Sequence, residues 1–275
     1  MTILWSPAPV LVAGPCVVES DPVNLVIATH LAELSTKLGL RVVYKASFDK
    51  ANRADARSPR GPGIDRGLAA LCRVREASGL PVLTDVHEVW QVEAAAAVVD
   101  ALQIPAFLCR QTDLLRAVGR TGRPVNIKKG QWMAPEAMGG AVEKVRGAGR
   151  VDLAVTERGT FFGYCDLVVD MRNFARLREA TGAPVIFDAT HAVQQPGRGP
   201  HGSSGGSRAD VPALLAAAAA AGADGFFLET HPDPASALSD PATTWPLAEL
   251  EEVVERALSV WHAAREKGTV PWLSR

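Results

Sequence analysis

The sequence predicts an α/β protein, a closed (β/α)8 barrel (TIM barrel), as one domain over residues 1–275. Apolar runs rich in Val, Ile and Phe recur roughly every 20 to 40 residues, each followed by a segment of helical character, which is the pattern of βαβ units. The runs are continuous rather than alternating, as in strands covered on both faces. An open doubly wound sheet is the alternative fold, but no GxGxxG loop follows the first run.

Eight runs are interpreted as the barrel strands. They are residues 10–16, 41–46, 81–85, 101–104, 124–128, 152–157, 184–188 and 225–229. Helix signals lie between them: Asp21-Pro22 opens the first helix and Gly39 ends it. Further helices are expected over residues 68–78, 92–99, 211–221 and 247–267.

Two long segments interrupt this rhythm, residues 47–67 after the second strand and residues 191–210 after the seventh. Loops of this length in a compact domain are usually functional or disordered. The second is rich in Gly and Ser, which favours a mobile lid.

Composition and charge limit the functions. The formal net charge is −1 and 47% of the residues are hydrophobic, so the sequence argues against a nucleic-acid or membrane partner and an anionic substrate needs a local basic cluster. The N-terminus lacks the basic start of a signal peptide, and residues 214–221 are too short to span a bilayer. Four dispersed cysteines indicate reduced thiols, so we expect a cytoplasmic protein.

The predicted strand ends carry polar, mostly ionisable residues. In a (β/α)8 barrel the active site forms at the carboxyl ends of the strands, so this ring predicts an enzyme. In strand order its members are Cys16, Lys45, Asp85 with His87, Gln103, Asn126 with Lys128, Glu157 with Arg158, Asp188 with His191, and Glu229 with His231.

Several cations converge on this predicted barrel mouth, which favours a ligand with two anionic groups, such as phosphate and carboxylate. They are Lys45, Lys50, Arg53, Lys128 and Arg158. Lys129 is interpreted as a surface residue, since adjacent strand residues face opposite ways. Asp85 and His87 are candidate proton carriers, with a supporting role as the alternative.

A metal site is a further hypothesis. The seventh, eighth and first strands are neighbours in a closed barrel, so Cys16, His191 and Glu229 can meet, and Asp240 could complete the set. These ligands suit Zn2+, Fe2+ or Mn2+. Their spacing alone is no metal signature, and a buried Cys is often a small hydrophobe.

Ten motifs occur in an order that resembles the 3-deoxy-D-manno-octulosonate 8-phosphate synthase family. They are GPCVVES, YKASFDKANR, RGPG, TDVHE, QIPAFLCRQTDLL, NIKKGQ, TERGTFFGY, LVVDMR, IFDATHAVQ and ETHPDP. The resemblance runs from about residue 10 to the end of the chain. It implies a (β/α)8 barrel, usually a homotetramer, which condenses phosphoenolpyruvate with D-arabinose 5-phosphate for lipopolysaccharide synthesis in a bacterial cytoplasm.

The resemblance also implies roles for residues. Lys128 and Arg158 would bind the phosphate of phosphoenolpyruvate, and Lys45 and Lys50 its carboxylate. The remaining substrate-binding candidates are Gln103 and Ala106 in the phosphoenolpyruvate pocket, Asn52 and Arg53 for the sugar phosphate, and Gln194. The candidate catalytic residues are Lys50, Asn52, Asp85, His87 and His191.

Members of this family either require a metal and carry Cys in the GPC motif, or need none and carry Asn there. Cys16 therefore implies the metal-requiring group, with Cys16, His191, Glu229 and Asp240 as ligands. One departure is that Ala54 and Asp55 follow the KANR motif where relatives commonly carry serines, so we expect one hydroxyl contact to the sugar phosphate to be missing.

Two alternatives remain. A related synthase that uses erythrose 4-phosphate shares the barrel and the GPC cysteine, but typically carries a KPR-type motif where this chain has Lys50-Ala51-Asn52-Arg53. A non-catalytic binding barrel would be expected to have lost members of the ring, which are present here.

Overall fold

The computed structural model describes residues 4–6, 8–53, 57–199, 202 and 204–266, and these form a closed parallel barrel. Its strands are β1 (Val10–Gly14), β2 (Arg41–Lys45), β3 (Val82–Asp85), β4 (Ala101–Ile104), β5 (Val125–Lys128), β6 (Leu153–Glu157), β9 (Val185–Asp188) and β12 (Gly225–His231). They pair in this order, and β12 pairs with β1 over five residues, from Val10 opposite Gly225 to Gly14 opposite Glu229. This closure confirms the predicted fold and excludes the open sheet.

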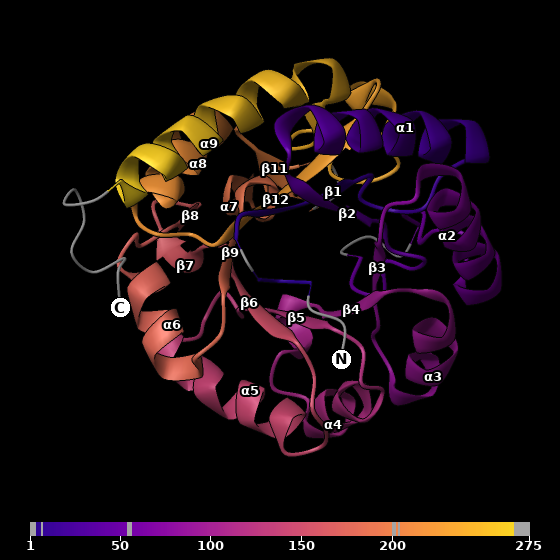
Figure 1. Cartoon of the computed structure of the whole chain (residues 1–275), viewed down its shortest axis with the longest axis horizontal. Coiled ribbons are helices and arrows are strands. Elements are labelled where there is room, and N and C mark those ends of the chain that lie inside the picture. The colour runs from indigo at the N-terminus through magenta and orange to yellow at the C-terminus, as the bar shows by residue number, and fades with distance from the viewer. Residues whose placement is uncertain (1–3, 7, 54–56, 200–201, 203, 267–275) are drawn as a thin grey trace.

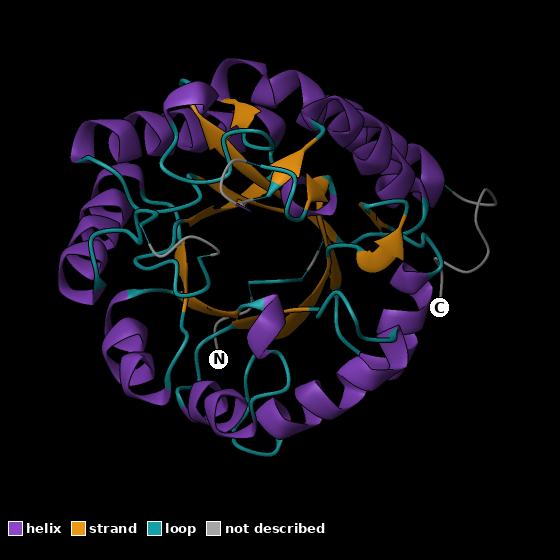
Figure 2. Ribbon diagram, turned by 180° about the vertical axis from the view of Figure 1, so that it is seen from behind, coloured by secondary structure: helices purple, strands orange, loops and turns teal. Residues whose placement is uncertain are grey.

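Helices form an outer ring around the strands (Figures 1 and 2). They are α1 (Asp21–Leu38), α2 (Ile64–Ser78), α3 (Val89–Val98), α4 (Thr112–Arg120), α5 (Met138–Arg146), α6 (Asn173–Thr181), α8 (Val211–Ala220) and α9 (Leu250–Arg265). Pro22 lies in the first turn of α1, and Gly39 ends this helix in the left-handed conformation, as its sequence predicts. None of the described helices is long and apolar enough to cross a membrane.

The predicted strand positions agree with the structure to within two residues, and the helices differ more. Helix α2 begins at Ile64, four residues before the predicted start, and α3 begins three residues early. The last helix was predicted over residues 247–267: residues 247–249 form a 3-10 turn before α9, and residue 267 lies outside the described residues.

The described part of residues 191–210 contains more regular structure than a Gly- and Ser-rich lid suggests. The helical turn α7 (Ala189–Ala192) leads into β10 (Gln194–Gln195), which pairs antiparallel with β11 (Gly205–Gly206). A second hairpin, β7 (Thr160–Gly163) with β8 (Asp166–Val168), follows β6 and was not predicted. Its strands have only four and three residues, which is too short for the alternation of apolar and polar residues to give a clear signal.

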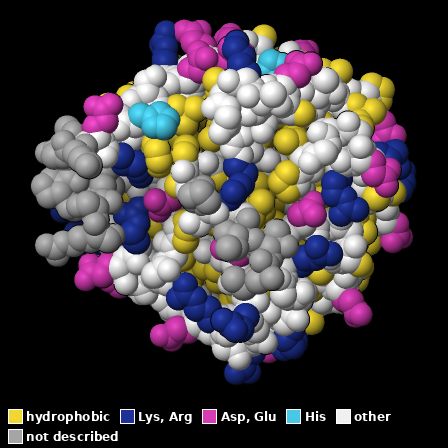
Figure 3. Space-filling view, in the orientation of Figure 1, with side chains coloured by type: hydrophobic (Ala, Val, Ile, Leu, Met, Phe, Trp, Pro, Cys, Tyr) yellow, Lys and Arg dark blue, Asp and Glu magenta, His cyan; other side chains and the backbone are white. Residues whose placement is uncertain are grey.

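Two apolar layers hold the barrel. The inner layer fills the barrel with residues such as Val12, Val43, Leu83 and Phe227, and the outer layer joins the strands to the helices. Trp5 is fully buried in the inner layer, and its backbone N–H donates to the Asp152 carboxylate at 2.9 Å. On the surface in Figure 3, acidic and basic side chains are interspersed, in keeping with the near-zero net charge.

Candidate active site at the carboxyl ends of the strands

Three predicted metal ligands meet at the seam where the barrel closes. One ligand atom each of Cys16, Glu229 and Asp240 lies within 4.8 Å of the other two, which no other group among the described residues matches. Cys16 follows β1, Glu229 belongs to β12, and Asp240 lies in the loop after β12. The predicted proximity of these three residues is confirmed, since β1 and β12 are paired neighbours.

The side chains of this cluster fit a divalent cation. The Cys16 Sγ–H donates to Asp240 Oδ2 at 3.1 Å, while Glu229 Oε2 is buried with no hydrogen-bond partner in the described chain. A buried carboxylate oxygen without a donor is costly, and a cation would satisfy it. One thiol and two carboxylates form a donor set used by borderline divalent ions.

His191 stands beside this cluster. Its Nε2 lies 3.6 Å from Glu229 Oε1, and its Nδ1 lies 2.8 Å from Asp188 Oδ2. A carboxylate on one ring nitrogen orients a histidine and leaves the other nitrogen free for a ligand. The structure therefore brings His191 next to Glu229, just outside the tight group of three.

The electrostatics of the cluster depend on burial. Burial and the neighbouring Glu229 raise the pKa of Cys16, which keeps the thiol protonated when no cation neutralises it. Burial acts to raise the pKa of Asp240 too, but His191, Lys50 and the hydrogen bond from Cys16 outweigh it and lower the pKa to about 2. Asp240 also adopts a left-handed backbone with φ 50°, which is uncommon outside glycine.

Two lysines border the cluster on the side of β2. Lys45 is buried, and its Nζ donates to Cys16 O at 3.1 Å and to Glu229 Oε1 at 3.2 Å. Lys50 is half-buried and donates to Ser47 Oγ at 2.9 Å. Burial opposes the charge of Lys50, but its electrostatic interactions with Cys16 and with the carboxylates of Asp85 and Glu229 outweigh burial and raise its pKa.

Asp85 and His87 lie beside these lysines at the end of β3. Asp85 accepts a hydrogen bond from Ser47 Oγ at 2.8 Å, and His87 Nε2 is 3.7 Å from Asp85 Oδ2. Burial would raise the pKa of Asp85, but Lys45, Lys50 and His87 hold it below its usual range. Burial lowers the pKa of His87. The pair thus offers a buried anion next to a neutral imidazole.

Lys128 and Arg158 supply cations from β5 and the turn after β6. Lys128 Nζ lies 3.5 Å from the centre of the Phe227 ring inside the barrel and donates to Asp188. Arg158 is 4% exposed, and its Nη2 donates to Gln194 Oε1 at 2.8 Å. Arg158 Nη1 is buried with no partner among the described residues, so its N–H groups can donate hydrogen bonds to a bound anion.

A chain of buried hydrogen bonds leads from β6 to Asp85. Thr156 Oγ1 donates to Asn126 Oδ1 at 2.7 Å, Asn126 Nδ2 to Gln103 Oε1 at 3.0 Å, and Gln103 Nε2 to Asp85 Oδ1 at 3.3 Å. All three bonds point toward the carboxylate. This chain fixes the amide of Gln103, and the buried Ala106 follows on the 3-10 turn after β4.

Arg53 and Asn52, the two motif residues in the loop after β2, differ in burial. Arg53 is half-buried and donates to Ser239 Oγ at 2.7 Å and to Leu238 O at 3.3 Å, next to Asp240. Asn52 lies in an exposed turn. Ala54 and Asp55, the departures from the family motif, lie outside the described residues.

The interpretation of Lys129 as a surface residue is wrong. Lys129 is fully buried, and its Nζ lies 3.5 Å from Glu157 Oε1, which is also fully buried. Alternation does turn Lys129 away from Lys128, but the hairpin after β6 covers that side, with Thr160 Oγ1 3.3 Å from Lys129 Nζ. The sequence carries no local signal of this cover.

The contacts of Ser47, Asp188 and Phe227 with these cations were not predicted from the sequence. For Asp188, the only sign of a functional role in the sequence was its position at the end of a predicted strand. Gln194, named only as a substrate-binding candidate, links Arg158 to Asp240 through hydrogen bonds of 2.8 Å on either side.

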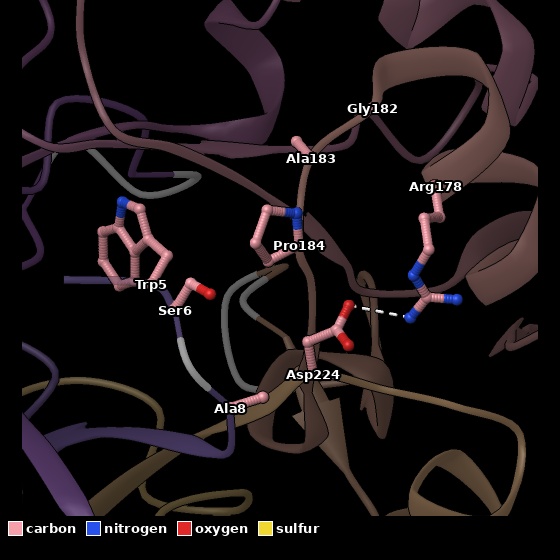
Figure 4. A pocket seen from close by; sticks show the side chains of 8 residues that line it. All are labelled: Trp5, Ser6, Ala8, Arg178, Gly182, Ala183, Pro184 and Asp224. Atoms are coloured by element: carbon pink, nitrogen blue, oxygen red, sulfur yellow. Dashed lines mark hydrogen bonds and ion pairs between the residues drawn. The ribbon is translucent and has the colours of Figure 1, made fainter. Parts of the chain in front are cut away.

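A separate pocket of about 290 Å³ lies at the opposite end of the barrel (Figure 4). Its lining includes Trp5, Pro184 and Asp224, which precede the strands β1, β9 and β12. Arg178 borders it, but Asp224 Oδ2 pairs with this guanidinium at 2.7 Å. The candidate metal-binding and substrate-binding residues therefore lie at the carboxyl ends of the strands, away from this pocket.

A closed parallel barrel with buried ionisable side chains at the carboxyl ends of its strands has the architecture of a (β/α)8-barrel enzyme. A profile of the DAHP synthetase I family matches residues 6–263. The chain therefore belongs to the DAHP synthetase I family, and it is an enzyme.

Curated relatives share about half of their residues with this chain. A protein of Syntrophotalea carbinolica is 55% identical over 250 residues, covering 91% of this chain and 90% of that protein. One of Thioalkalivibrio sulfidiphilus is 56% identical over 244 residues, covering 89% and 86%. One of Alkalilimnicola ehrlichii is 53% identical over 258 residues, covering 94% and 92%. All three are named 2-dehydro-3-deoxyphosphooctonate aldolase, which confirms the family resemblance seen in the motifs.

Proposed function

We propose that this enzyme condenses phosphoenolpyruvate with D-arabinose 5-phosphate and water, giving 3-deoxy-D-manno-octulosonate 8-phosphate and inorganic phosphate. The observation that carries the proposal is the pair of buried cations Lys128 and Arg158, at the same barrel end as the cluster of Cys16, Glu229 and Asp240. The names of the relatives describe an eight-carbon acid phosphate. Three carbons from phosphoenolpyruvate require a five-carbon aldose, whereas erythrose 4-phosphate would give seven.

The site divides between the two substrates. Lys128 and Arg158 bind the phosphate of phosphoenolpyruvate, and Gln103 and Ala106 line this pocket. Arg158 Nη1, which has no hydrogen-bond partner among the described residues, is one donor to the phosphate. Lys45 and Lys50 bind the carboxylate of phosphoenolpyruvate. These charges hold an anionic substrate in place and neutralise its negative charge.

The sugar phosphate binds on the side of Arg53. Among the described residues, its hydrogen bonds go to the neutral oxygens of Ser239, Leu238 and Pro59, which leaves its charge available for a phosphate. Asn52 lies beside Arg53 in the same loop and contacts the sugar. Gln194, which connects Arg158 with Asp240, borders both substrates.

In the reaction, C3 of phosphoenolpyruvate forms a bond to the aldehyde carbon of the sugar, and a water oxygen adds to C2. The C2–O bond of the resulting tetrahedral centre then breaks and releases inorganic phosphate. Lys50, Asn52, Asp85, His87 and His191 are the candidate catalytic residues. Asp85 is held as an anion and His87 as a neutral imidazole, so this pair suits proton transfer during water addition.

Cys16, His191, Glu229 and Asp240 would hold a divalent cation, Zn2+, Fe2+ or Mn2+. When bound, such an ion supplies Lewis-acid polarisation of an oxygen at this end of the barrel. The orphaned Glu229 Oε2 and the oriented imidazole of His191 support this assignment.

We further propose a cytoplasmic homotetramer. All four cysteines are free, in keeping with a reducing compartment. Phe162 and Tyr164 on the β7–β8 hairpin are 97% and 92% exposed, which supports burial against another subunit. Light scattering coupled to size-exclusion chromatography tests the oligomeric state.

A side-by-side assay of the two aldoses tests the function. Phosphate release from phosphoenolpyruvate should depend on added D-arabinose 5-phosphate, and the eight-carbon product should appear in mass spectrometry. Equal or faster turnover of erythrose 4-phosphate would favour the seven-carbon reaction instead. An absence of release with either sugar would favour a non-catalytic barrel.

A further inference from the structure

The carboxyl ends of β5 and β6 carry a second pair of charges, on the side of the strands away from the substrate. Lys129 and Glu157 are both fully buried, with Lys129 Nζ 3.5 Å from Glu157 Oε1. Each adjoins in sequence a candidate phosphate-binding cation: Lys129 follows Lys128, and Glu157 precedes Arg158.

Glu157 binds the turn that carries Arg158. Its Oε1 accepts the backbone N–H of Arg158 at 2.9 Å and that of Gly159 at 2.7 Å. Its Oε2 accepts Asn173 Nδ2 at 2.9 Å, at the start of α6. The carboxylate therefore ties the turn after β6 to a helix of the outer ring.

Lys129 holds the same turn from β5. Its Nζ lies 3.4 Å from Gly159 O and 3.3 Å from Thr160 Oγ1, and its backbone N–H donates to Thr156 O at 2.8 Å. The two side chains thus bracket Gly159, which has a left-handed φ of 89° and where a Cβ would lie 2.9 Å from Leu167 Cβ. These contacts leave no room for a side chain at Gly159.

A buried ion pair is an inefficient way to stabilise a fold, because apolar side chains of similar volume often serve as well. It does fix geometry when its hydrogen bonds are directional. We propose that Lys129 and Glu157 are positioning residues that set the spacing between Lys128 and Arg158, and so match this pair to the phosphate of phosphoenolpyruvate. This inference rests on the proposed function of Lys128 and Arg158.

The test compares Lys129→Met, Glu157→Gln and the double variant in full-length, metal-loaded enzyme. Lys129→Met should raise the KM for phosphoenolpyruvate on the order of 10-fold, the effect of misplacing a charged hydrogen bond, with kcat changed less. Glu157→Gln keeps an oxygen for the two backbone N–H groups and should have a smaller effect. The KM for the sugar should stay near that of the wild type in all three.

The double variant separates positioning from stability. It removes the unpaired buried charge while keeping the amide oxygen, so its thermal midpoint should recover relative to Lys129→Met. Because the bonds from Lys129 to Gly159 and Thr160 are still missing, the KM for phosphoenolpyruvate should stay raised. A KM that returns to the wild-type value together with the midpoint would overturn the proposal.

A matched control lies at the opposite end of the barrel. Arg178→Met breaks the ion pair with Asp224 (Figure 4) and should lower the thermal midpoint while the KM for phosphoenolpyruvate is unchanged. An active wild type whose Lys129→Met and double variants keep the wild-type KM refutes the positioning role alone. A wild type that neither binds nor consumes phosphoenolpyruvate refutes the proposed function as well.

Discussion

The Asp188 carboxylate holds His191 through Nδ1, with Oδ2 at 2.8 Å, and turns the opposite ring nitrogen toward Glu229. The same carboxylate binds Lys128 Nζ. One buried anion therefore orients both a candidate metal ligand and a candidate phosphate-binding cation. Asp188 therefore links the candidate metal site to the candidate phosphate-binding site.

Replacing Asp188 should weaken metal binding. Asp188→Asn removes the charge that orients His191, and losing such an outer partner typically costs on the order of 10- to 100-fold in metal affinity. Titration of the metal-free variant with Zn2+ or Mn2+ measures the effect. Asp224→Asn, at the far end of the barrel, should keep the wild-type affinity. Equal affinities in the two variants would contradict the assignment.

Removal of the metal should abolish activity. We expect exhaustive chelation to stop phosphate release and an added divalent ion to restore it, with the metal content verified at each stage. Cys16→Asn should lose less activity than Cys16→Ala, because an amide N–H can replace the bond from Sγ to Asp240, whereas alanine leaves the Asp240 carboxylate without it. Full activity in verified metal-free enzyme would refute the metal requirement.

Arg158→Lys should raise the KM for phosphoenolpyruvate. Lysine keeps the charge but cannot supply both the bond to Gln194 and the free Nη1 donor, and one lost charged hydrogen bond corresponds to roughly a 10- to 100-fold change. Steady-state kinetics at saturating sugar measure it. Arg178→Lys serves as the control, and a KM within twofold of the wild type for Arg158→Lys would exclude this role.

Acid should destabilise the fold through Asp85 and His87. The lowered pKa of Asp85 contributes stability that is present above the unfolded value of about 4 and is lost as the pH falls below it. The lowered pKa of His87 means that the unfolded chain binds a proton more readily below about pH 6.5, which also favours unfolding as the pH falls.

Calorimetry between about pH 8 and about pH 3 measures how the thermal midpoint depends on pH. The thermal midpoint should fall gently below about pH 6.5 and more steeply below about pH 4. His87→Gln should flatten the upper part of this curve, whereas His262→Gln, at an exposed position, should not. A midpoint that rises on acidification would show that the sign is wrong.

Closure of the barrel depends on a missing side chain at Gly225. A Cβ there would lie 2.5 Å from Val10 Cγ1 and 2.6 Å from Val10 O, so Gly225→Ala should push β12 from β1 and cost about 2 kcal/mol or more. Gly140→Ala, on an exposed side of α5 with no atom within 4 Å, should be neutral or stabilising. Chemical denaturation of the two variants checks this difference.

The sequence alone determined the barrel and the position of its chemistry. Continuous apolar runs, helix-ending glycines and polar strand ends are local patterns, and a local pattern specifies which segments are strands and which residues stand at their ends. The order of closure then predicted that Cys16 and Glu229 would meet, and they do. The hairpin after β6 was not predicted, because its strands are too short for their periodicity to be distinctive.

Only the tertiary structure decided which neighbours each charge has. Lys128 and Lys129 are adjacent in sequence, yet one lies over Phe227 inside the barrel and the other pairs with Glu157 beneath a hairpin. The contacts of Asp188 with both Lys128 and His191 could not be predicted from the sequence either. These partners are distant in sequence and their energies depend on burial, which arises only when the strands, helices and loops pack together.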